Sequence, residues 1–403
     1  MQLIAATLPF VDSDSWKCLF ALEKGQEQYE YVPKSLVARY ARLRPEGLHK
    51  VLGHLMKYDL VVYERKPAYE GYRLTWNGFD YIALRAFIHS GIIESVGPRI
   101  GVGKEADVHI VSLKNKTFCL KIHRLGRTSF RSAKSKRGYL KPGEDKVNWL
   151  HMSCLSAETE FTYMKQLRGH GLPTPKPIDH NRHMIIMTFA DGLILNKVKK
   201  LHKTVMEDLL QRLFQCLVDM LSLGLVHGDY NEFNLLVSVT RDRGSRQGTR
   251  MDHNEAETES IGIQDTLDLT KVKAKVDLTM IDFPQVVTVA HPHARELFER
   301  DVESIRSFFW KRFRYEINSE DLPSFDDIVT NDMIQHLALR TTSRVMYDQL
   351  MTQRRGDLDS DITSIDTANS QVQSSINSQV QSDSYDQETD EEADVEGICG
   401  ASG

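Results

Sequence analysis

The sequence is poor in cysteine, and the cysteines that it has are far apart. It contains five, none of them in a Cys-x-x-Cys pair: Cys18, Cys119, Cys154, Cys216 and Cys399. Disulfide-stapled domains and structural zinc sites need numerous or closely spaced cysteines. The scarcity therefore argues against both and indicates a reducing compartment.

Long apolar runs are also missing. No uninterrupted apolar run approaches the roughly 20 residues that span a bilayer. Residues 1–7 lack a basic flank and are soon followed by Asp12 and Asp14, so the start is a poor match to a signal peptide. We therefore expect a soluble, cytoplasmic protein without a membrane partner.

Positive charge is absent from the end of the sequence. No Lys or Arg follows Arg355, although the 403 residues include 51 of them. The formal net charge of -5 thus conceals a basic body and an acidic, low-complexity tail. A basic body is compatible with nucleic acid, and a solvated surface is the simpler alternative. The length predicts two to three folded units.

Residues 1–92 predict a winged helix. Three short helical patterns come first, and strands at 60–63 and 72–75 then flank a wing loop before a closing helix. The third helix and the wing of such domains usually face nucleic acid. Basic side chains lie near the second and third helices: Arg42, Arg44, His49, Lys50 and His54. Contact with protein is the alternative use of this domain.

A strand–turn–strand pattern at 100–111 carries two glycines at its turn, Gly101 and Gly103. Glycine lets backbone N–H groups approach a phosphate closely. The next strand, 117–123, places Lys121 centrally, on the face opposite its apolar neighbours. A lysine there is typical of a clamp on nucleotide phosphates. An ordinary hairpin and a surface lysine would explain each feature alone.

Two later elements complete a predicted nucleotide pocket. Glu160, on a helical pattern, is the candidate partner that would hold Lys121 in place. A following apolar strand leads into the expected hinge, where backbone groups of Phe189 and Ala190 would face adenine and Met187 would line the back of the pocket. A surface glutamate and a core methionine are the simpler alternatives.

The strongest motif runs from His227 to Asn234. Asp229 and Asn234 have the spacing of a kinase catalytic loop, in which the Asp is the catalytic base and the Asn holds magnesium. Asp282, after a β-type run, would be the second metal ligand, because Mg²⁺ takes few protein oxygens beside phosphate oxygens. Each is alone explained as a turn residue. Together they predict a phosphotransferase that uses ATP and Mg²⁺.

Two internal segments are predicted to be loose. Residues 124–146 are rich in Lys and Arg and are interpreted as a mobile loop that contacts phosphates of nucleotide or RNA, with a solvated linker as the alternative. Their run 134–137 weakly resembles a nuclear import signal, which would add shuttling through the nucleus. The polar stretch at about 240–275 predicts a disordered insertion.

In this order, the motifs resemble those of the RIO family of atypical serine/threonine kinases, and within it the winged-helix-bearing second subfamily. The resemblance is carried by residues 100–107, 121–131, 173–183, 225–234, 281–285 and 298–302. It implies an α+β chain with a winged helix (1–92), a kinase N-lobe (93–190) and C-lobe (191–330), an extension (331–355) and a disordered acidic tail (356–403).

The resemblance also implies roles for single residues. Lys121, paired to Glu160, would contact phosphates, with Asp229 catalytic and Asn234 and Asp282 on Mg²⁺. The segment that would cover the phosphates is Gly101, Val102, Gly103, Lys104, Glu105 and Ala106. Members of the family are thought to act largely as ATPases, with a transient phosphoryl group at the position of Asp282. The implied partners are the precursor small ribosomal subunit, its pre-rRNA and assembly factors, in late maturation of that subunit.

The sequence departs from ordinary protein kinases in ways that matter for substrate. Pro284 stands where a Gly would follow the metal Asp and Phe, and no Ala-Pro-Glu segment comes after it, which puts a peptide-docking site in doubt. Within the family, Ala106 replaces a frequent Ser and removes a possible phosphate-binding hydroxyl. Tyr230 replaces a usual Phe, with little effect expected.

Two other hypotheses stay open at this point. A small-molecule phosphotransferase of the aminoglycoside type would share the His-Gly-Asp loop, but the winged helix argues against it. An RNA- or ribosome-binding scaffold with a vestigial kinase fold would have little need of the full set of candidate catalytic residues. The sequence does not decide between kinase and ATPase, and it does not give the oligomeric state.

Overall fold

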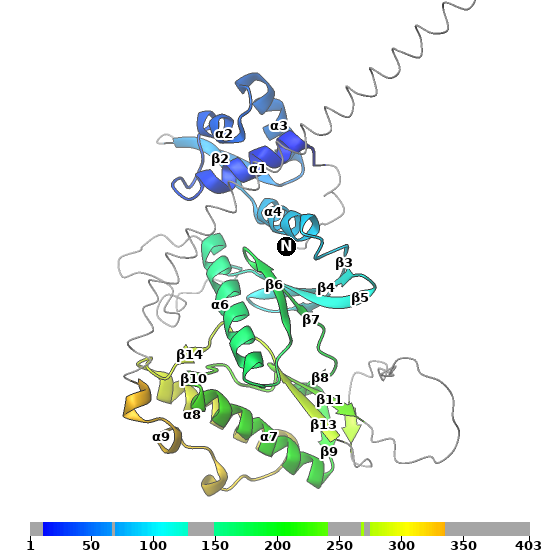
Figure 1. Cartoon of the computed structure of the whole chain (residues 1–403), viewed down its shortest axis with the longest axis vertical. Coiled ribbons are helices and arrows are strands. Elements are labelled where there is room, and N and C mark those ends of the chain that lie inside the picture. Colours follow the sequence, from blue (N-terminus) through cyan, green and yellow to red (C-terminus); the bar gives the residue numbers. More distant parts are fainter. Residues whose placement is uncertain (1–10, 67–68, 128–148, 241–266, 270–274, 335–403) are drawn as a thin grey trace, which may run out of the picture. The chain divides into compact units, whose positions relative to one another are not determined.

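The computed structural model describes residues 11–66, 69–127, 149–240, 267–269 and 275–334 (Figure 1). The described chain falls into two compact units that divide between Arg85 and Ala86, inside a single helix, α4 (Trp76–His89). Each unit has its own buried apolar residues.

The first unit has the predicted order of three helices, a hairpin and a helix. Its elements before α4 are α1 (Ser13–Gly25), α2 (Lys34–Ala41), α3 (Pro45–Lys57), β1 (Val61–Lys66) and β2 (Tyr69–Leu74). Asp12 caps α1, since its Oδ1 accepts a hydrogen bond from the Ser15 N–H at 2.7 Å. The predicted winged-helix pattern is confirmed.

The wing is longer than the sequence predicts. We expected strands at 60–63 and 72–75, but β1 and β2 stay paired in antiparallel register out to Lys66 and Tyr69. Cross-strand contacts hold the outer part together, because the hydroxyl of Tyr63 donates to Glu70 at 3.2 Å and Arg65 lies 3.5 Å from the same carboxylate. The alternation of apolar and polar residues ends before the strands do, and polar cross-strand pairs extend the hairpin beyond that point.

The second unit begins with an antiparallel sheet and one long helix, the N-lobe (Figure 1). Its five strands have the spatial order β3-β4-β5-β7-β6. The elements are β3 (Ser95–Val102), β4 (Ala106–Leu113), β5 (Lys116–His123), α6 (Trp149–Gly169), β6 (Pro177–Asn181) and β7 (Met184–Thr188). The helix packs on β5, β6 and β7 and so brings its residues to the strand that carries Lys121.

The C-lobe consists of two long helices and several short strands. Its elements are β8 (Leu193–Ile194), η2 (Leu195–Lys197), β9 (Val198–Leu201), α7 (Lys203–Ser222), β10 (Leu225–Val226), β11 (Leu235–Thr240), β12 (Leu267–Leu269), β13 (Lys275–Met280), β14 (Val287–Thr288), α8 (Ala294–Phe313), η3 (Ser319–Asp321) and α9 (Phe325–Ile328). Strands β13, β11 and β8 form one small sheet. The catalytic-loop motif lies between β10 and β11.

One apolar core joins the two lobes. It runs from Cys119 and Met187 in the N-lobe sheet to the buried face of α7, where Leu209, Leu213 and Leu217 recur at helical spacing. The same core continues through the buried face of α8. The loops between these elements are thus anchored on packed helices and strands.

The prediction of a wholly disordered insertion at 240–275 is wrong in part. Residues Leu267–Leu269 form β12, which pairs in parallel with β9, and β11 and β13 pair as far as Thr240 and Lys275. The rest of the insertion, at 241–266 and 270–274, lies outside the described residues, as do most of the basic segment, at 128–148, and the acidic tail.

The scattered cysteines and the lack of long apolar runs in the sequence can be compared with the described part of the structure. The four cysteines that lie there, Cys18, Cys119, Cys154 and Cys216, are free and buried. Among the described helices, none is long and apolar enough to cross a membrane.

Candidate active site

Lys121 is the centre of a buried ion-pair network. From the middle of β5 its Nζ lies 2.7 Å from Oε1 of Glu160 on α6 and 2.5 Å from Oδ1 of Asp282. Only 7% of Lys121 and 1% of Glu160 are exposed, so the alternatives of a surface lysine and a surface glutamate do not apply. The structure thus brings together three residues predicted from separate motifs.

Burial and opposite charge act against each other in this network. Burial alone would raise the pKa of Glu160, but the charge of Lys121 and contacts with His123 outweigh it and lower that pKa to about 2. Burial alone would lower the pKa of Lys121, but Asp282 and Glu160 outweigh it and raise it. Both groups are therefore charged at neutral pH.

Two further groups lie against Glu160. His123, two residues along β5 from Lys121, has Nε2 at 3.0 Å from Oε2 of Glu160, and its Nδ1 lies 3.1 Å from the hydroxyl of Ser156. The backbone N–H of Phe283 donates to Oε1 of Glu160 at 3.3 Å. Sequence reasoning missed His123, although its spacing puts it on the same face of the strand as Lys121.

The carboxylate of Asp229 is held by three amide donors. Its oxygens accept from Nδ2 of Asn231 at 3.0 Å, from Nδ2 of Asn234 at 3.2 Å and from Nε2 of Gln285 at 3.2 Å. Burial and then the nearby charge of Asp282 raise its pKa. A fixed carboxylate with a raised pKa suits a general base. Asn231 and Gln285 were not predicted as site residues, because the Asp229–Asn234 spacing does not include them.

The backbone of the catalytic loop is anchored from α8. The buried carboxylate of Asp301 accepts the N–H of Gly228 at 2.7 Å and the N–H of Tyr230 at 2.9 Å, and Arg300 donates to the carbonyl of Gly228. Burial raises the pKa of Asp301 to about 7. An acidic residue among the buried apolar positions of α8 was the available signal for this role, which sequence reasoning did not assign.

Gly228 can only be glycine in this loop. Its φ is 76°, in the left-handed region, and a Cβ would lie 2.7 Å from the carbonyl oxygen of Gln285. The next residues are packed from below, since the buried Tyr230 donates its hydroxyl to the carbonyl of Leu213 at 3.1 Å. Tyr230 therefore makes a bond to α7 that a phenylalanine could not make.

His227 is a buried neutral residue. Its ring packs against Tyr230 and Phe283, each with centroids 5.5 Å away, and burial lowers its pKa to about 4. It thus supports the ring of Phe283, the residue that follows Asp282.

Asp282 adopts an unusual backbone conformation. Its φ is 72°, which among residues other than glycine is favoured by Asp and Asn. The N–H of its neighbour Ile281 donates to the carbonyl of Asn234 at 3.0 Å, so the two predicted metal ligands stand on adjacent backbone segments. Strain of this kind persists where the surroundings enforce it and is frequent at functional sites.

The residues present fit a magnesium–nucleotide site. Nδ2 of Asn234 donates twice to Asp229, to the backbone oxygen at 2.9 Å and to the carboxylate, and this fixes the amide with its oxygen free for a cation. Asp282 is 38% exposed at its side chain and supplies an anionic oxygen. Among the described residues no cluster of three or more His, Cys, Asp or Glu could hold a metal. One amide and one carboxylate match an ion that keeps water and phosphate oxygens as its other ligands.

The glycine turn is open to solvent. Ile100 and Val102 are 48% and 64% exposed, and Lys104 is exposed as well, whereas Glu105 and Ala106 are half-buried. Gly103 closes the turn by donating its N–H to the carbonyl of Ala106 at 2.7 Å. Gly101 carries no side chain that would cover the backbone, so the turn can approach a phosphate.

The turn is tied to the start of the basic segment. Arg127 pairs with the buried Asp107 and donates to the carbonyl of Gly103 at 3.1 Å, and Arg124 is itself buried near Asp107. The prediction of a loose phosphate-binding loop is therefore wrong for these first residues, because their charges are used within the fold. Residues from 128 on lie outside the described part.

The predicted adenine pocket lies on the Lys121 face of the sheet. Register pairs Cys119 with Met187 and Lys121 with Val108, which places these four side chains on one face. Met187 is buried, Phe189 is 41% exposed and Ala190 is half-buried. Cys119 and Val108 belong to the candidate pocket and were not named from the sequence.

The geometry alone defines the class of protein to which this fold belongs. A five-stranded N-lobe, a helical C-lobe, a strand lysine paired to a helix glutamate and an Asp–Asn loop form a protein-kinase-like fold.

Comparison with known proteins identifies the family. The family described as "RIO domain" matches residues 107–245 and 272–322, and "Rio2, N-terminal" matches residues 8–90. The Schizosaccharomyces pombe serine/threonine-protein kinase rio2 is 36% identical over 329 residues, which cover 81% of this chain and 84% of the relative. The chain belongs to the Rio2 family of RIO kinases. The resemblance and the fold class expected from the sequence are confirmed.

A solved structure agrees with this assignment. The Rio2 kinase of Chaetomium thermophilum, in a complex described as ADP/Mg²⁺-phosphoaspartate, is 30% identical, with a TM-score of 0.68 over 91% of this chain and 100% of that one. The match to the Caenorhabditis elegans serine/threonine-protein kinase RIO2 is 38% identical over 81% of this chain. The chain spans only about half the length of the C. elegans and Dictyostelium discoideum relatives, 54% and 55%.

Proposed function

We propose that this protein is a Mg²⁺- and ATP-dependent kinase or ATPase of the RIO type that acts in late maturation of the small ribosomal subunit. The observation that carries the enzymatic part is the convergence of Lys121, Glu160 and Asp282 within 2.7 Å, beside a fixed Asp229. A vestigial fold would have no reason to keep three buried or half-buried charges in one network, since burial of charge is costly.

Each side chain has a definite task in this proposal. Lys121, positioned by Glu160, would neutralise charge on the phosphates of ATP, and Asn234 and Asp282 would hold Mg²⁺, whose contribution when bound would be neutralisation of phosphate charge. Asp229 accepts the proton of the attacking hydroxyl or water, for which its raised pKa is suited. Positioning and charge neutralisation supply most of the rate, because phosphoryl transfer needs little covalent help from the protein.

Asp282 is also the candidate for a transient phosphoryl acceptor. The phosphoaspartate named in the C. thermophilum complex supports this assignment. Transfer would form a bond from a carboxylate oxygen of Asp282 to the γ-phosphorus of ATP and release ADP. Attack by water, with its proton passing to Asp229, would then release inorganic phosphate and restore the carboxylate. Serine/threonine transfer would replace that water by a hydroxyl of a protein.

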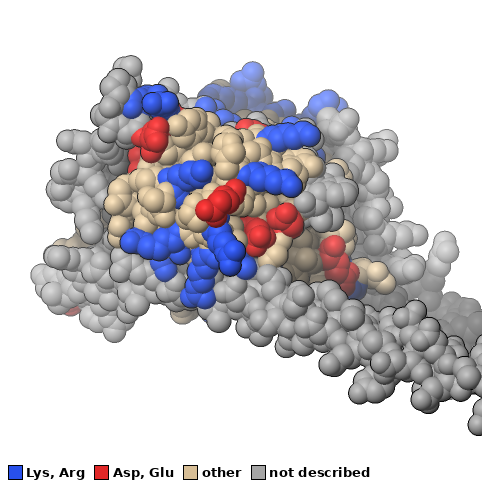
Figure 2. Space-filling view, turned by 90° about the horizontal axis from the view of Figure 1, so that it is seen from above, with Lys and Arg blue, Asp and Glu red and all other residues tan. Residues whose placement is uncertain are grey.

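The ribosomal part of the proposal is supported by the first unit. Exposed basic residues lie at α3 and along the wing: Arg42, Arg44, Lys50, Lys57, Arg65 and Lys66. Figure 2 shows Lys and Arg side chains gathered over the face seen from above, with fewer acidic ones between them. Such a surface suits the phosphates of pre-rRNA within a precursor small subunit, where assembly factors would be neighbours. We therefore propose the cytoplasm as its place of action.

The test is turnover of labelled ATP by the full chain with Mg²⁺, with and without precursor small subunits. Asp229→Ala is expected to lower turnover by about 10²–10⁴-fold and to spare nucleotide binding. Phosphate release stimulated by the particle without labelling of another protein means an ATPase, and transfer to one particle protein means a kinase. Equal turnover in the variant would refute the base assignment. Bound nucleotide without turnover in the natural chain would leave a scaffold.

A further inference from the structure

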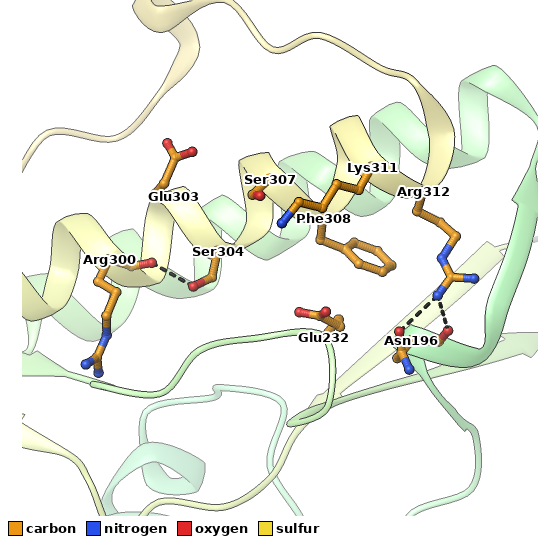
Figure 3. Close-up of a pocket in the computed structure, with 9 residues that line it drawn as sticks. All are labelled: Asn196, Glu232, Arg300, Glu303, Ser304, Ser307, Phe308, Lys311 and Arg312. Carbon is orange, nitrogen blue, oxygen red and sulfur yellow. Dashed lines mark hydrogen bonds between the residues drawn. The ribbon is translucent and has the colours of Figure 1, made fainter.

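A polar pocket lies in the C-lobe, outside the nucleotide site. It has a volume of about 770 Å³ and is formed by α8, the catalytic loop and η2 (Figure 3). Its lining residues are Asn196, Glu232, Arg300, Glu303, Ser304, Ser307, Phe308, Lys311 and Arg312. The ring of Phe308 is largely buried beneath the polar groups. The pocket is large enough for one or two amino-acid side chains.

The pocket shares its wall with the catalytic loop. Arg300 donates to the carbonyl of Gly228, the residue before Asp229, and Glu232 stands three residues after Asp229. Three residues span at most about 11 Å of chain, so the backbone of Glu232 lies within about 11 Å of that of Asp229. The N–H of Asn196 donates to the backbone oxygen of Glu232 at 3.0 Å, which fixes this side of the pocket.

Several charges in the pocket are already engaged. Arg312 donates to both oxygens of Asn196 at 2.9 Å, and Glu303 pairs with Arg306 at 3.3 Å. Among the described residues, Lys311 and the side chain of Glu232 have no hydrogen-bond or ion-pair partner. In Figure 3 the Lys311 side chain extends over Phe308, above Glu232. One cation and one anion are therefore available to a ligand.

We propose that this pocket docks a polypeptide segment that carries the acceptor hydroxyl for phosphoryl transfer. A polypeptide can offer a basic residue to Glu232 and an acidic residue to Lys311, and its backbone matches the hydroxyl of Ser307. A nucleic-acid strand suits the pocket less, because its phosphates would face the carboxylates of Glu232 and Glu303. The inference rests on the proposed kinase activity and supplies a docking position in a chain that lacks an Ala-Pro-Glu segment.

The geometry also sets the spacing of the recognised residues. An extended segment rises about 3.3 Å per residue. A span of at most about 11 Å from Glu232 to Asp229 then places the basic residue that Glu232 recognises within three or four residues of the acceptor Ser or Thr.

The experiment is a positional-scanning peptide library with one Ser acceptor, tested with the full chain. Phosphate incorporation is measured with Mg²⁺-ATP, and binding is measured separately with a non-hydrolysable ATP analogue. We expect a preference for a basic residue within four positions of the Ser and for an acidic residue at a more distant position. Lys311→Glu should abolish the preference for the acidic residue and raise KM for such peptides roughly tenfold, since it replaces attraction by repulsion. ATP turnover without peptide should be unchanged.

Two controls make the outcome specific. Lys165→Glu reverses an exposed charge on α6, far in sequence from the pocket, and should leave the profile unchanged. Lys311→Arg should keep the natural preference. An identical peptide profile in the natural chain and Lys311→Glu would overturn the proposal, as would loss of single-stranded RNA binding in that variant with peptide binding intact. Failure of the kinase proposal appears separately, as ATP turnover without phosphate incorporation or as no turnover at all, while peptide binding still tests the pocket.

Discussion

The two walls of the candidate nucleotide site are built in opposite ways. The wall formed by β5, α6 and the catalytic loop is buried, and its charged groups have partners: Lys121 with Glu160 and Asp282, and Asp301 with two backbone N–H groups. The wall formed by the glycine turn is exposed, with Val102 at 64%. Groups that must keep an exact position are locked before any ligand arrives, and groups that must admit a ligand are left open.

The largest expected effect comes from replacing Lys121, which lies at the centre of the buried wall. Lys121→Ala leaves Glu160 buried without its cation, which should destabilise the second unit by about 3–5 kcal/mol. Val102→Ala, in the open wall, should change stability by no more than about 0.5 kcal/mol. Urea unfolding of both variants measures the difference. If the two variants unfold at the same urea concentration, the locked wall has no special stability.

The next change removes a charge and spares the backbone. Asp282→Asn keeps a residue type that tolerates a φ of 72°, so the fold should be retained. Mg²⁺-dependent ATP binding should weaken at least about tenfold, because an anionic ligand is lost. Titration of a fluorescent ATP analogue with and without Mg²⁺ tests this. Unchanged affinity in the presence of Mg²⁺ would remove Asp282 from the metal site.

Asp301 should give the stability a distinctive dependence on pH. Its pKa is about 7 in the folded protein and about 3.9 in an unfolded chain, so the folded state binds more protons between these values. Stability from this group is thus fully present below about pH 4 and is lost as pH rises through about 7. The Glu160 pKa of about 2 acts in a separate window, below about pH 4.5.

The measurement is thermal unfolding from pH 4.5 to 8 for the natural chain and Asp301→Asn. The natural chain should lose more stability than the variant as pH rises, since Asn does not titrate. Parallel curves would show that Asp301 does not bind a proton in this range.

The smallest expected effect concerns the hydroxyl of Tyr230, in the catalytic loop. Tyr230→Phe removes a hydrogen bond to the carbonyl of Leu213 and should cost about 1 kcal/mol of stability. ATP turnover should be retained, because the backbone N–H of residue 230 still donates to Asp301. A loss of turnover without a loss of stability would assign the hydroxyl a part in the reaction instead.

Much of the site could be predicted because its residues follow regular spacings. Lys121 on a strand and the Asp229–Asn234 pair carry the chemistry in fixed local patterns. The roles of Asp301, His123 and Gln285 were not assigned, because these residues act through contacts with residues that are distant in sequence; Asp301 lies 71 positions from Tyr230. Local spacing places His123 on the Lys121 face and Asp301 on the buried face of α8, but it does not identify their partners. The strand β12 was missed for the same reason, since its partner β9 precedes it by more than 60 residues and composition alone indicated disorder.

Gly228 limits how this enzyme could be regulated. Ordinary protein kinases carry an arginine between the His and Asp of the catalytic loop, and in many of them phosphorylation of the activation segment orders that segment through arginine contacts. Here the carbonyl of Gln285 occupies the space that the first side-chain atom would need. An arginine cannot be installed at this position without rebuilding the loop. A phosphorylation signal read by residue 228 is therefore closed to this chain.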